Sequence, residues 1–561
     1  MTELLTAAQM RAIEQAAIEA GEVTGLELME RAGRGVVEAV FEEWPELAAA
    51  PHKAVVLCGP GNNGGDGFVV ARLLKEWGWE VEVFLYGDAS RLRPDARVNY
   101  ESVADLVKSN ETWWTPNSWG ADVVFDALFG TGTFRQPKGV LYDALIALAF
   151  SCDDHRLVSI DLPTGLCADS GKPLIKTPRT ETNFAVGCDL AVTFHLPKRG
   201  HLLEQGPHYS NQFVTVDIGL SLRDPFKDLR GSYKGYTKRD EAVFTVYAEK
   251  LPEPFRFMDP NEFAFGGLRK LANNKFGNGH SFVLAGGSGK TGAARLAARG
   301  ALRIGAGLVT LGVPGAAQME VASQVTSIML KRAGTEDEVA SVLADKRINA
   351  GCLGPVWALE RARGLVEVVL KDTRPGPRSG ASTGEAPDQV RGGLHVVLDA
   401  DALSAFEGEP EALFGMLHEN CVLTPHGGEF ARLFPDIAEK LNATPTKGPA
   451  YSKVDATRAA AKRAGCVVLF KGPDTVIAAP DGRCSINSAH YDRAAPWLAT
   501  AGSGDVLAGF VTGLLARGFS PMQAAETAAW LHVECARAFG PGLIAEDLPE
   551  ALPGVFRDLG V

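Results

Sequence analysis

The segment Thr500-Ala-Gly-Ser-Gly-Asp505 joins small residues, glycines and one carboxylate in a pattern that suits phosphoryl transfer. Its small residues let backbone N–H groups turn toward an anion, and the apolar helix expected over residues 506–515 points its positive dipole end at the same place. Asp505 stands at that junction, where a carboxylate can take the proton from a hydroxyl that attacks a phosphate. The same residues also suit an ordinary glycine-rich turn with Asp505 as a helix cap, so this segment alone leaves both interpretations open.

Three segments of the first half place polar residues directly after expected strands. They are Gly59-Pro-Gly-Asn-Asn-Gly-Gly-Asp-Gly67, Asp126-Ala-Leu-Phe-Gly-Thr-Gly132 and Asp161-Leu-Pro-Thr-Gly165. Because the carboxyl ends of neighbouring strands in an open α/β sheet face one crevice, Asn63, Asp126 and Thr164 can converge there. Their oxygen atoms suit a hard cation, either an alkali metal ion or Mg²⁺, and Asp161 can serve as an acid or a base. Glycine and Asx residues also form plain turns, but three such loops in register favour a site.

Alternating strands and helices are expected to hold these loops. The hydrophobic pattern predicts strands over residues 53–58, 81–86, 122–128, 157–161, 190–194 and 213–218, and helices over 7–20, 26–40 and 68–77. Strands that alternate with helices predict a parallel, doubly wound sheet. The glycines at 59, 61 and 64 have the spacing of a dinucleotide fingerprint, but no acidic residue closes the next strand where a ribose would need it. Asp88 is the nearest, so this match is weak.

The second half repeats the pattern of a strand followed by a polar loop. Three such segments are His395-Val-Val-Leu-Asp-Ala-Asp-Ala402, Val422-Leu-Thr-Pro-His-Gly-Gly-Glu429 and Val467-Val-Leu-Phe-Lys-Gly-Pro-Asp-Thr475. Asp399 and Asp401 share a face if their strand continues, and they are equally compatible with a turn. His426 stands beside two glycines and a glutamate at a strand end, which favours a ligand-facing histidine over a structural one. These loops predict a parallel α/β domain whose strand ends bind anions and nucleotides, and they favour a functional role for Asp505.

Length, composition and charge define the class of protein. A chain of 561 residues with 46% hydrophobic and 22% charged residues predicts a globular protein of about two to four domains. The net charge of −12 argues against a nucleic-acid backbone or an anionic membrane as a partner. Nine scattered cysteines without a CxxC pair predict a reducing compartment. With no signal peptide and no run of about 18 apolar residues, we expect a cytoplasmic protein.

The loops of the first half, together with Leu28-Met-Glu-Arg-Ala-Gly33, resemble the NAD(P)H-hydrate epimerase domain over residues 1–225. The resemblance implies a Rossmann-like fold, a potassium ion on Asn63, Asp126 and Thr164, and Asp161 as the catalytic residue. The family more often has serine at position 164, and both residues offer a hydroxyl and a carbonyl group. The hydrate-binding groups that it implies are Asn62, Asn63, Gly64, Gly65, Asp66, Gly130, Thr131, Gly132, Thr133, Phe134, Arg135, Gln136 and Asp161.

Residues 262–561 resemble the ribokinase-like ADP/ATP-dependent NAD(P)H-hydrate dehydratases. The matching segments are Thr291-Gly-Ala-Ala294, Gly305-Ala-Gly-Leu-Val-Thr310, Leu398-Asp-Ala-Asp-Ala402, Leu423-Thr-Pro-His-Gly-Gly-Glu429, Lys471-Gly-Pro-Asp-Thr475 and Ala501-Gly-Ser-Gly-Asp505. The resemblance implies Asp505 as the catalytic base, with Ala293, His426 and Asp505 on the hydrate. The nucleotide contacts that it implies are Lys471, Gly472, Pro473, Asp474, Thr475 and Gly504. One departure is Gly354-Pro-Val-Trp-Ala358, where the family usually carries Gly-Pro-Gly-x-Gly, so bulkier residues stand at a hydrate contact.

A linker is expected between the two domains, over residues 226–261. This region is charged, contains several prolines and shows no sustained period, apart from a short strand expected near 242–246. A second stretch rich in proline, glycine and serine, residues 374–393, is expected to be a mobile surface insertion.

Both resemblances concern one damaged metabolite. NADH and NADPH can take up water across a ring double bond, which yields R and S hydrates that no longer donate hydride. The first domain is expected to interconvert the epimers through proton transfer by Asp161. The second is expected to phosphorylate the S hydrate from ADP, with Mg²⁺, and then to eliminate phosphate. The expected partners are these hydrates (NADHX and NADPHX), ADP and a second copy of the chain in a homo-oligomer, with no nucleic acid and no membrane.

Two other functions stay open on the sequence. A ribokinase-like kinase for a hydroxymethylpyrimidine or a sugar would share the chemistry of Asp505, but it would not explain the first domain. A non-catalytic sensor of nucleotides or RNA could use the fold of the first domain. The complete Asn-Asn-Gly-Gly-Asp loop with Asp126 and Asp161 argues against a sensor, and the acidic net charge argues against RNA.

Overall fold

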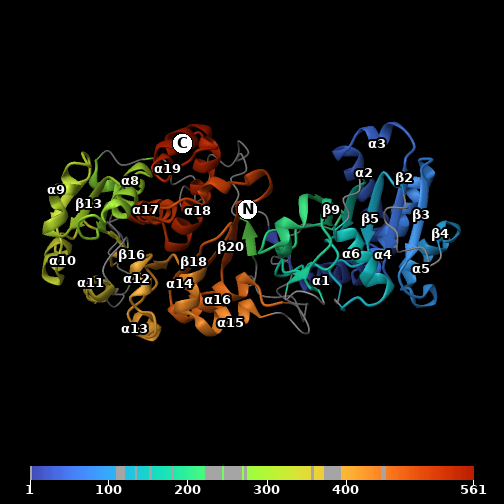
Figure 1. Ribbon diagram of the computed structural model, residues 1–561, viewed down its shortest axis with the longest axis horizontal. Helices are drawn as coiled ribbons and strands as arrows, with labels where there is room; N and C mark the ends of the chain where they lie inside the picture. Colours follow the sequence, from blue (N-terminus) through green and yellow to red (C-terminus); the bar gives the residue numbers. More distant parts are fainter. Residues whose placement is uncertain are drawn as a thin grey trace. The chain divides into compact units, whose positions relative to one another are not determined.

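The computed structural model of the chain describes residues 3–108, 120–132, 135–150, 155–177, 182–220, 243–245, 268, 270, 274–354, 359–371, 393–443 and 450–561. The chain divides into two compact units. The N-terminal unit comprises residues 2–243 and 443–453, and the C-terminal unit comprises residues 244–442 and 454–561. In Figure 1 the first is blue to green and the second yellow-green to red. The expected domain boundaries and almost all of the expected linker and insertion lie outside the described residues, so they stay predictions.

The N-terminal unit is built on a parallel sheet, as the sequence predicts. Its strand order is β10-β9-β6-β5-β2-β3-β4, and each neighbouring pair is parallel. The loops expected to carry chemistry follow β2, β5 and β6, which are adjacent, so they meet at one edge of the sheet. The strands are β1 (Glu3–Leu4), β2 (Lys53–Cys58), β3 (Glu80–Leu85), β4 (Val107–Lys108), β5 (Val123–Ala127), β6 (Arg156–Ile160), β7 (Ile175–Lys176), β8 (Asn183–Phe184), β9 (Cys188–Phe194) and β10 (Ser210–Val216).

Helices cover both faces of this sheet, which confirms the doubly wound class. Alternate residues of β2 face opposite layers: Val56 belongs to the core formed with α1, α2 and α4, and Val55 and Leu57 belong to the core formed with α6. The helices are α1 (Ala7–Glu19), α2 (Gly25–Glu43), α3 (Glu46–Ala49), α4 (Asn62–Glu76), α5 (Pro94–Glu101) and α6 (Val140–Phe150).

Helix α4 begins earlier than the sequence predicts, at Asn62 instead of Phe68. The glycines that suggest a loop serve close packing instead: a Cβ on Gly64 would lie 1.9 Å from the carbonyl oxygen of Gly59. The Asn-Asn-Gly-Gly-Asp run therefore starts the helix, and the backbone N–H groups of its first residues, before Gly65, have no partner within the helix. An N-terminal turn of this kind is suited to binding the phosphates of a dinucleotide.

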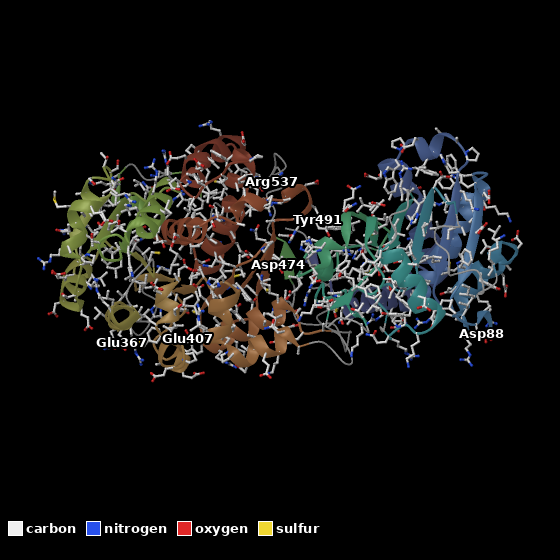
Figure 2. The ribbon with its side chains drawn as sticks, in the orientation of Figure 1. Asp88, Glu367, Glu407, Asp474, Tyr491 and Arg537 are labelled. Atoms are coloured by element: carbon white, nitrogen blue, oxygen red, sulfur yellow. The ribbon has the colours of Figure 1, made fainter. Side chains whose placement is uncertain are left out.

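Asp88 has a local structural role and does not close β3. Its side chain accepts a hydrogen bond from the Ser90 N–H at 2.9 Å and caps the short 3-10 helix Ala89–Arg91. The side chain lies at an exposed position (Figure 2). The glycine loop therefore lacks the acidic partner of a conventional dinucleotide fingerprint, in agreement with the sequence.

The C-terminal unit has a larger sheet of mixed direction. Its order runs β11-β20-β19-β18-β17-β16-β15-β12-β13-β14, parallel from β14 to β18 and antiparallel from β18 to β20. The strand expected near 242–246 is present as β11. The strands are β11 (Val243–Thr245), β12 (His280–Leu284), β13 (Leu308–Val313), β14 (Met329–Arg332), β15 (Ala350–Leu353), β16 (His395–Leu398), β17 (Cys421–Leu423), β18 (Val467–Phe470), β19 (Asp474–Ala478) and β20 (Cys484–Ser488).

Alternation along β18 places helices on both sides of this sheet. Leu469 packs into the core formed with α8, α17, α18 and α19, whereas the ring of Phe470 stacks on Phe430 of α14 on the opposite side. No helix in the described part of the chain is long and apolar enough to cross a membrane. The helices are α8 (Gly292–Arg303), α9 (Gln318–Ala322), α10 (Glu336–Leu343), α11 (Leu359–Lys371), α12 (Asp401–Ser404), α13 (Pro410–Phe414), α14 (Gly427–Leu433), α15 (Pro435–Asn442), α16 (Lys453–Ala464), α17 (Ser503–Ala516), α18 (Pro521–Phe539) and α19 (Asp547–Asp558).

Helices α8 and α17 pack closely because glycines lie between them. A Cβ on Gly509 would lie 2.1 Å from the carbonyl oxygen of Ala297, and one on Gly513 would lie 2.6 Å from that of Ala301. The two helices therefore run parallel in a constant register. Helix α17 starts at Ser503 and not at the expected Val506.

Candidate active sites

A cavity of about 600 Å³ lies at the carboxyl edge of the N-terminal sheet. The first turn of α4, the loop after β5, the residues that follow β6 and β9, and one face of α1 line it. Gly64 and Gly65 are buried in α4 and do not line it, and Thr133 and Phe134 lie outside the described residues. The predicted hydrate-binding residues that line it are Asn62, Asn63, Asp66, Gly130, Thr131, Gly132, Arg135, Gln136 and Asp161.

Asp161 is fixed in this cavity by its backbone and by three donors. It follows β6 with φ +69°, a left-handed conformation that aspartate tolerates better than most residues. Its Oδ2 accepts a hydrogen bond from the Thr131 N–H at 3.1 Å, and its Oδ1 accepts one from the Thr193 hydroxyl at 3.1 Å. The same Oδ1 lies 3.0 Å from the Lys198 ammonium. Burial raises the pKa of Asp161, but Lys198 and the hydrogen bonds outweigh burial and hold the pKa below its usual value.

Lys198 is an important residue that the sequence does not reveal. Its side chain is only 1% exposed, and its Nζ also donates to the Thr193 hydroxyl at 2.8 Å and to the Phe194 carbonyl at 3.0 Å. A buried ammonium with all its protons engaged is a fixed positive charge beside Asp161. Nothing in Leu196-Pro-Lys-Arg-Gly200 distinguishes this lysine from a surface lysine, so only the fold identifies it.

Two further carboxyl groups line the same cavity. Burial raises the pKa of Asp66 well above its usual value, and the neighbouring Glu14 and Asp161 raise it further. Burial, and then the charge of Asp161, raise the pKa of Glu14 to about 7. The cavity thus combines one ionised carboxylate with two groups that hold their protons more strongly, an arrangement that separates a base from an acid. The hydrophobic pattern around Glu14 indicates a helix but no site residue, so the sequence does not reveal that Glu14 lines the cavity.

The chemistry of the expected potassium ligands fits a hard cation. Asp126 is 1% exposed, and its two oxygens accept hydrogen bonds from the Thr164 hydroxyl at 2.7 Å and the Thr164 N–H at 2.9 Å. Burial raises the pKa of Asp126, and no lysine or arginine of the described residues forms an ion pair with it. The side-chain nitrogen of Asn63 is buried without a hydrogen-bond partner in this part of the molecule. A buried carboxylate without a counter-charge, next to hydroxyl, carbonyl and amide oxygens, suits a monovalent cation.

Asp505 stands in the first turn of α17, where the loops of the C-terminal sheet meet. Lys471, after β18, places its Nζ 2.7 Å from Asp399 Oδ1 and 3.9 Å from Glu429 Oε2. A Cβ on Gly504 would lie 3.4 Å from the same nitrogen. Burial and the charge of Asp399 raise the pKa of Asp505 to about 7; Lys471 opposes them and Glu429 adds to them. Asp505 therefore exchanges its proton near neutral pH, as a general base should.

Asp399 and Asp401 do not share a face, because the chain turns between them. Strand β16 ends at Leu398, Ala400 takes φ +45°, and α12 starts at Asp401. Asp399 is buried and accepts a hydrogen bond from the Thr424 hydroxyl at 2.8 Å. Of the two interpretations that the sequence allows, the turn is correct, and Asp399 forms an ion pair with Lys471.

The predicted hydrate residues of the C-terminal unit lie at the starts of three helices, α8, α14 and α17. The side chain of His426 is 55% exposed, and its Nδ1 accepts a hydrogen bond from the Gly428 N–H at 3.0 Å, so it caps α14 and still faces solvent. Ala293 lies in the first turn of α8, opposite Asp505 in the register of the two helices. Residues 355–358, where the chain departs from the family pattern, lie outside the described residues.

The predicted nucleotide segment divides into three parts. Lys471 points toward Asp399, Gly472 and Pro473 are exposed in the turn, and Asp474 and Thr475 are buried at the start of β19. Figure 2 labels Asp474. The Thr475 hydroxyl donates to the Gly472 carbonyl at 2.7 Å, which fixes the shape of the turn. Lys471 and the exposed turn are therefore the parts that can reach a nucleotide.

Comparison with known proteins gives the same division of the chain. Residues 25–200 match the family described as the YjeF-related protein N-terminus, and residues 281–549 match the NAD(P)H-hydrate dehydratase family. The chain is 33% identical to the bifunctional NAD(P)H-hydrate repair enzyme Nnr of Moorella thermoacetica, over 99% of this chain and 97% of that protein. It is 46% identical to the NAD(P)H-hydrate epimerase of Rhodobacter capsulatus, over 36% of this chain and 92% of that protein.

Solved structures also align with parts of the chain, and one of them is a dehydratase. It is the ADP/ATP-dependent NAD(P)H-hydrate dehydratase from Bacillus subtilis, co-crystallized with ATP and Mg²⁺, with a TM-score of 0.40 and 25% identity over 52% of this chain and 93% of that chain. The relative from Moorella thermoacetica spans both units at once. The chain therefore belongs to the family of bifunctional NAD(P)H-hydrate repair enzymes.

Proposed function

We propose that the N-terminal unit interconverts the R and S hydrates of NADH and NADPH, and that the C-terminal unit uses ADP to dehydrate the S hydrate, giving NAD(P)H, AMP and phosphate. The observation that supports this best is that each unit has its own carboxylate with a shifted pKa, Asp161 directly after β6 and Asp505 in the first turn of α17. A kinase alone would leave the N-terminal cavity without a use. A sensor would not need a buried ion pair that keeps Asp161 ionised.

The epimerase reaction takes place at the carbon that bears the added water. Water adds to an enamine at the carbon next to nitrogen, so the hydrate is a hemiaminal whose hydroxyl proton is the one to remove. Asp161 is ionised and buried, and it has no proton to lose first, so it can accept that proton. The first turn of α4 lines the same cavity and can hold the pyrophosphate. A potassium ion on Asn63, Asp126 and Thr164 would supply positive charge near those phosphates.

The dehydratase reaction needs a better leaving group than hydroxide. Phosphorylation of the ring hydroxyl supplies one, because phosphate leaves readily where hydroxide does not. Asp505 takes the hydroxyl proton, and the N–H groups at the start of α17 point toward the transferred phosphoryl group. Lys471, held by Asp399 next to Gly504, supplies a positive charge at the same place. A magnesium ion would accompany the nucleotide and neutralise its phosphates.

Recovery of reduced nicotinamide absorbance tests both activities in one assay. The purified chain is given mixed NADH hydrate epimers, Mg²⁺, K⁺ and either ADP or ATP. Full recovery with ADP is the expected result, and recovery with ATP alone would change the proposed donor. Recovery that stops when the S epimer is consumed would contradict the epimerase. A stable phosphorylated product without released phosphate would replace the dehydratase by a kinase.

A further inference from the structure

Glu14 has no part in the chemistry described so far, although it lines the epimerase cavity. It lies on the face of α1 that also presents Met10, Arg11 and Ile18 to the cavity. Asp161 has three donors, whereas Glu14 accepts no hydrogen bond and forms no ion pair with any described residue. A partly buried carboxyl group without a donor is costly unless it has a function or a ligand.

The start of α1 is tied to the segment that carries Lys198. Leu5 forms a β-bridge with Lys198, with hydrogen bonds from the Leu5 N–H to the Pro197 carbonyl at 3.0 Å and from the Arg199 N–H to the Leu5 carbonyl at 3.1 Å. The segment after β9 that places the Lys198 ammonium beside Asp161 therefore also fixes the position of the residues that precede α1.

A second tie lies one turn further along α1. The Arg11 guanidinium donates to the Thr131 carbonyl, and the Thr131 N–H donates to Asp161 Oδ2 at 3.1 Å. Glu14 follows Arg11 by three residues, so it shares the face of the helix that Arg11 anchors. Its position in the cavity is thus fixed relative to Asp161 from two sides.

The charges around Glu14 give it a pKa that differs from those of the other carboxyl groups in the cavity. Burial and then Asp161 raise the pKa of Glu14 to about 7, while Lys198 and Arg11 lower it. Burial raises the pKa of Asp66 well above its usual value, so Asp66 holds its proton more strongly than an exposed carboxyl group does. The charged and titratable residues that line the cavity with Glu14 are Arg11, Asp66, Tyr86, Arg93, Asp95, Arg135, Asp161 and Lys198.

We propose that Glu14 is the second proton carrier of epimer exchange, acting on the ring nitrogen while Asp161 acts on the hydroxyl. This proposal rests on the proposed epimerase function. Asp161 removes the hydroxyl proton, the C–O bond becomes C=O, and the bond between that carbon and the ring nitrogen breaks. The electron pair of the broken bond stays on nitrogen, which takes the proton of Glu14 and becomes N–H.

Ring closure reverses these transfers on the other face of the carbonyl carbon. After the open aldehyde rotates, the nitrogen attacks, Glu14 takes its proton back and Asp161 returns a proton to the oxygen. The reaction consumes no co-reactant and leaves both carboxyl groups as they began. Two groups are required because one of them must be ionised and the other protonated at the same time.

The test compares Glu14→Gln with Glu19→Gln in the full chain. Glu19 is an exposed residue on the same helix that does not line the cavity, so it controls for the chemical change. Exchange between the separated R and S hydrates is followed without nucleotide, with the uncatalysed rate subtracted. We expect Glu14→Gln to lower kcat by about 10²- to 10⁴-fold with KM changed little, and Glu19→Gln to match the parent. ADP-dependent dehydration of the S hydrate, measured on the same samples, controls for the amount of active protein, and a thermal unfolding curve that matches the parent reports that the N-terminal unit is folded.

The pH profile distinguishes proton transfer from a structural role. The active form has Asp161 ionised and Glu14 protonated, so kcat/KM of the parent should fall as pH rises through about 7. Glu14→Gln should lose that fall, and Glu14→Asp should restore part of the rate. An unchanged kcat in Glu14→Gln, or a loss confined to KM, would overturn the proposal. If the parent itself exchanges no epimers, the epimerase function fails instead.

Discussion

The ammonium group of Lys198 lies 3.0 Å from the carboxylate of Asp161, and both side chains are buried beneath the epimerase cavity. The pair makes Asp161 a base whose charge does not depend on solvent. It also links activity to stability, because a buried carboxylate is favourable only while its cation is present.

Replacement of Lys198 by methionine should therefore slow epimer exchange and destabilise the N-terminal unit. Without the ammonium, burial dominates and the pKa of Asp161 rises, so the acidic limb of the pH profile should move to higher pH. In the parent the depressed pKa stabilises the fold above the unfolded value of about 3.9, and this contribution is lost as pH falls. We expect a loss of about 3–5 kcal/mol at neutral pH, measured by denaturant unfolding. Lys176→Met, an exposed change in the same unit, should be nearly neutral.

Asp505→Asn should remove dehydration and leave epimer exchange intact in the same molecule. It should also stabilise the C-terminal unit. Because the native pKa of about 7 lies above the unfolded value of about 3.9, ionisation of Asp505 destabilises the fold progressively between these values. The stabilisation should therefore be larger at pH 8, by roughly 1–3 kcal/mol, than at pH 4.5. Thermal unfolding at both pH values measures it, with the exposed Asp492→Asn as control. Retained dehydration would contradict the role of Asp505.

Asp399→Asn should shift the pH dependence of dehydration. Asp399 raises the pKa of Asp505, so removal of its charge lowers that pKa. Asp399 also holds Lys471 at 2.7 Å. The acidic limb of kcat should move to lower pH, and KM for the nucleotide should rise because Lys471 loses its partner. An acidic limb of kcat that stays at the same pH would contradict the influence of Asp399 on the pKa of Asp505. Asp481→Asn, which breaks an exposed pair with Arg483, provides the control.

Two substitutions at position 164 test the potassium site. Thr164→Ser keeps the hydroxyl that donates to Asp126, whereas Thr164→Val removes it. The serine variant should retain epimer exchange, and the valine variant should need at least about tenfold more K⁺ for half-maximal rate, a difference near 1.4 kcal/mol. Titration with KCl at constant ionic strength measures this. Equal potassium dependence in both variants, or no dependence in the parent, would contradict the site.

The sequence predicts the strands and the loops after them well, because alternating hydrophobic runs and Gly/Asx punctuation are local signals. Strand β2 has the predicted bounds, and Asp126, near the end of β5, and Asp161, directly after β6, belong to adjacent strands as expected. Helix α4 starts at Asn62 and not at the predicted residue 68, because the absence of a Cβ on Gly64 lets the helix approach Gly59. That contact is long-range in space and leaves no local pattern.

The residues that the sequence missed act through distant neighbours. Lys198 is significant only because β9 ends beside Asp161, and Glu14 only because α1 crosses the same cavity. The sequence shows that Asp399 is a carboxylate after a strand, but its contact with Lys471 depends on β16, β17 and β18 being adjacent. A single sequence shows the type of each residue, but only the tertiary structure shows which distant residues lie close together.

The glycine-mediated packing of α8 and α17 extends the dehydratase site beyond the residues that touch substrate. Gly509 and Gly513 set the spacing of the two helices, and Asp505 and Ala293 stand at the ends that this spacing aligns. An alanine at either glycine would separate the helices and move the base away from the hydrate. In a screen for loss of dehydration, fully buried positions a full helical turn or more from any ligand would then behave like contact residues, while epimer exchange in the same clones stayed normal.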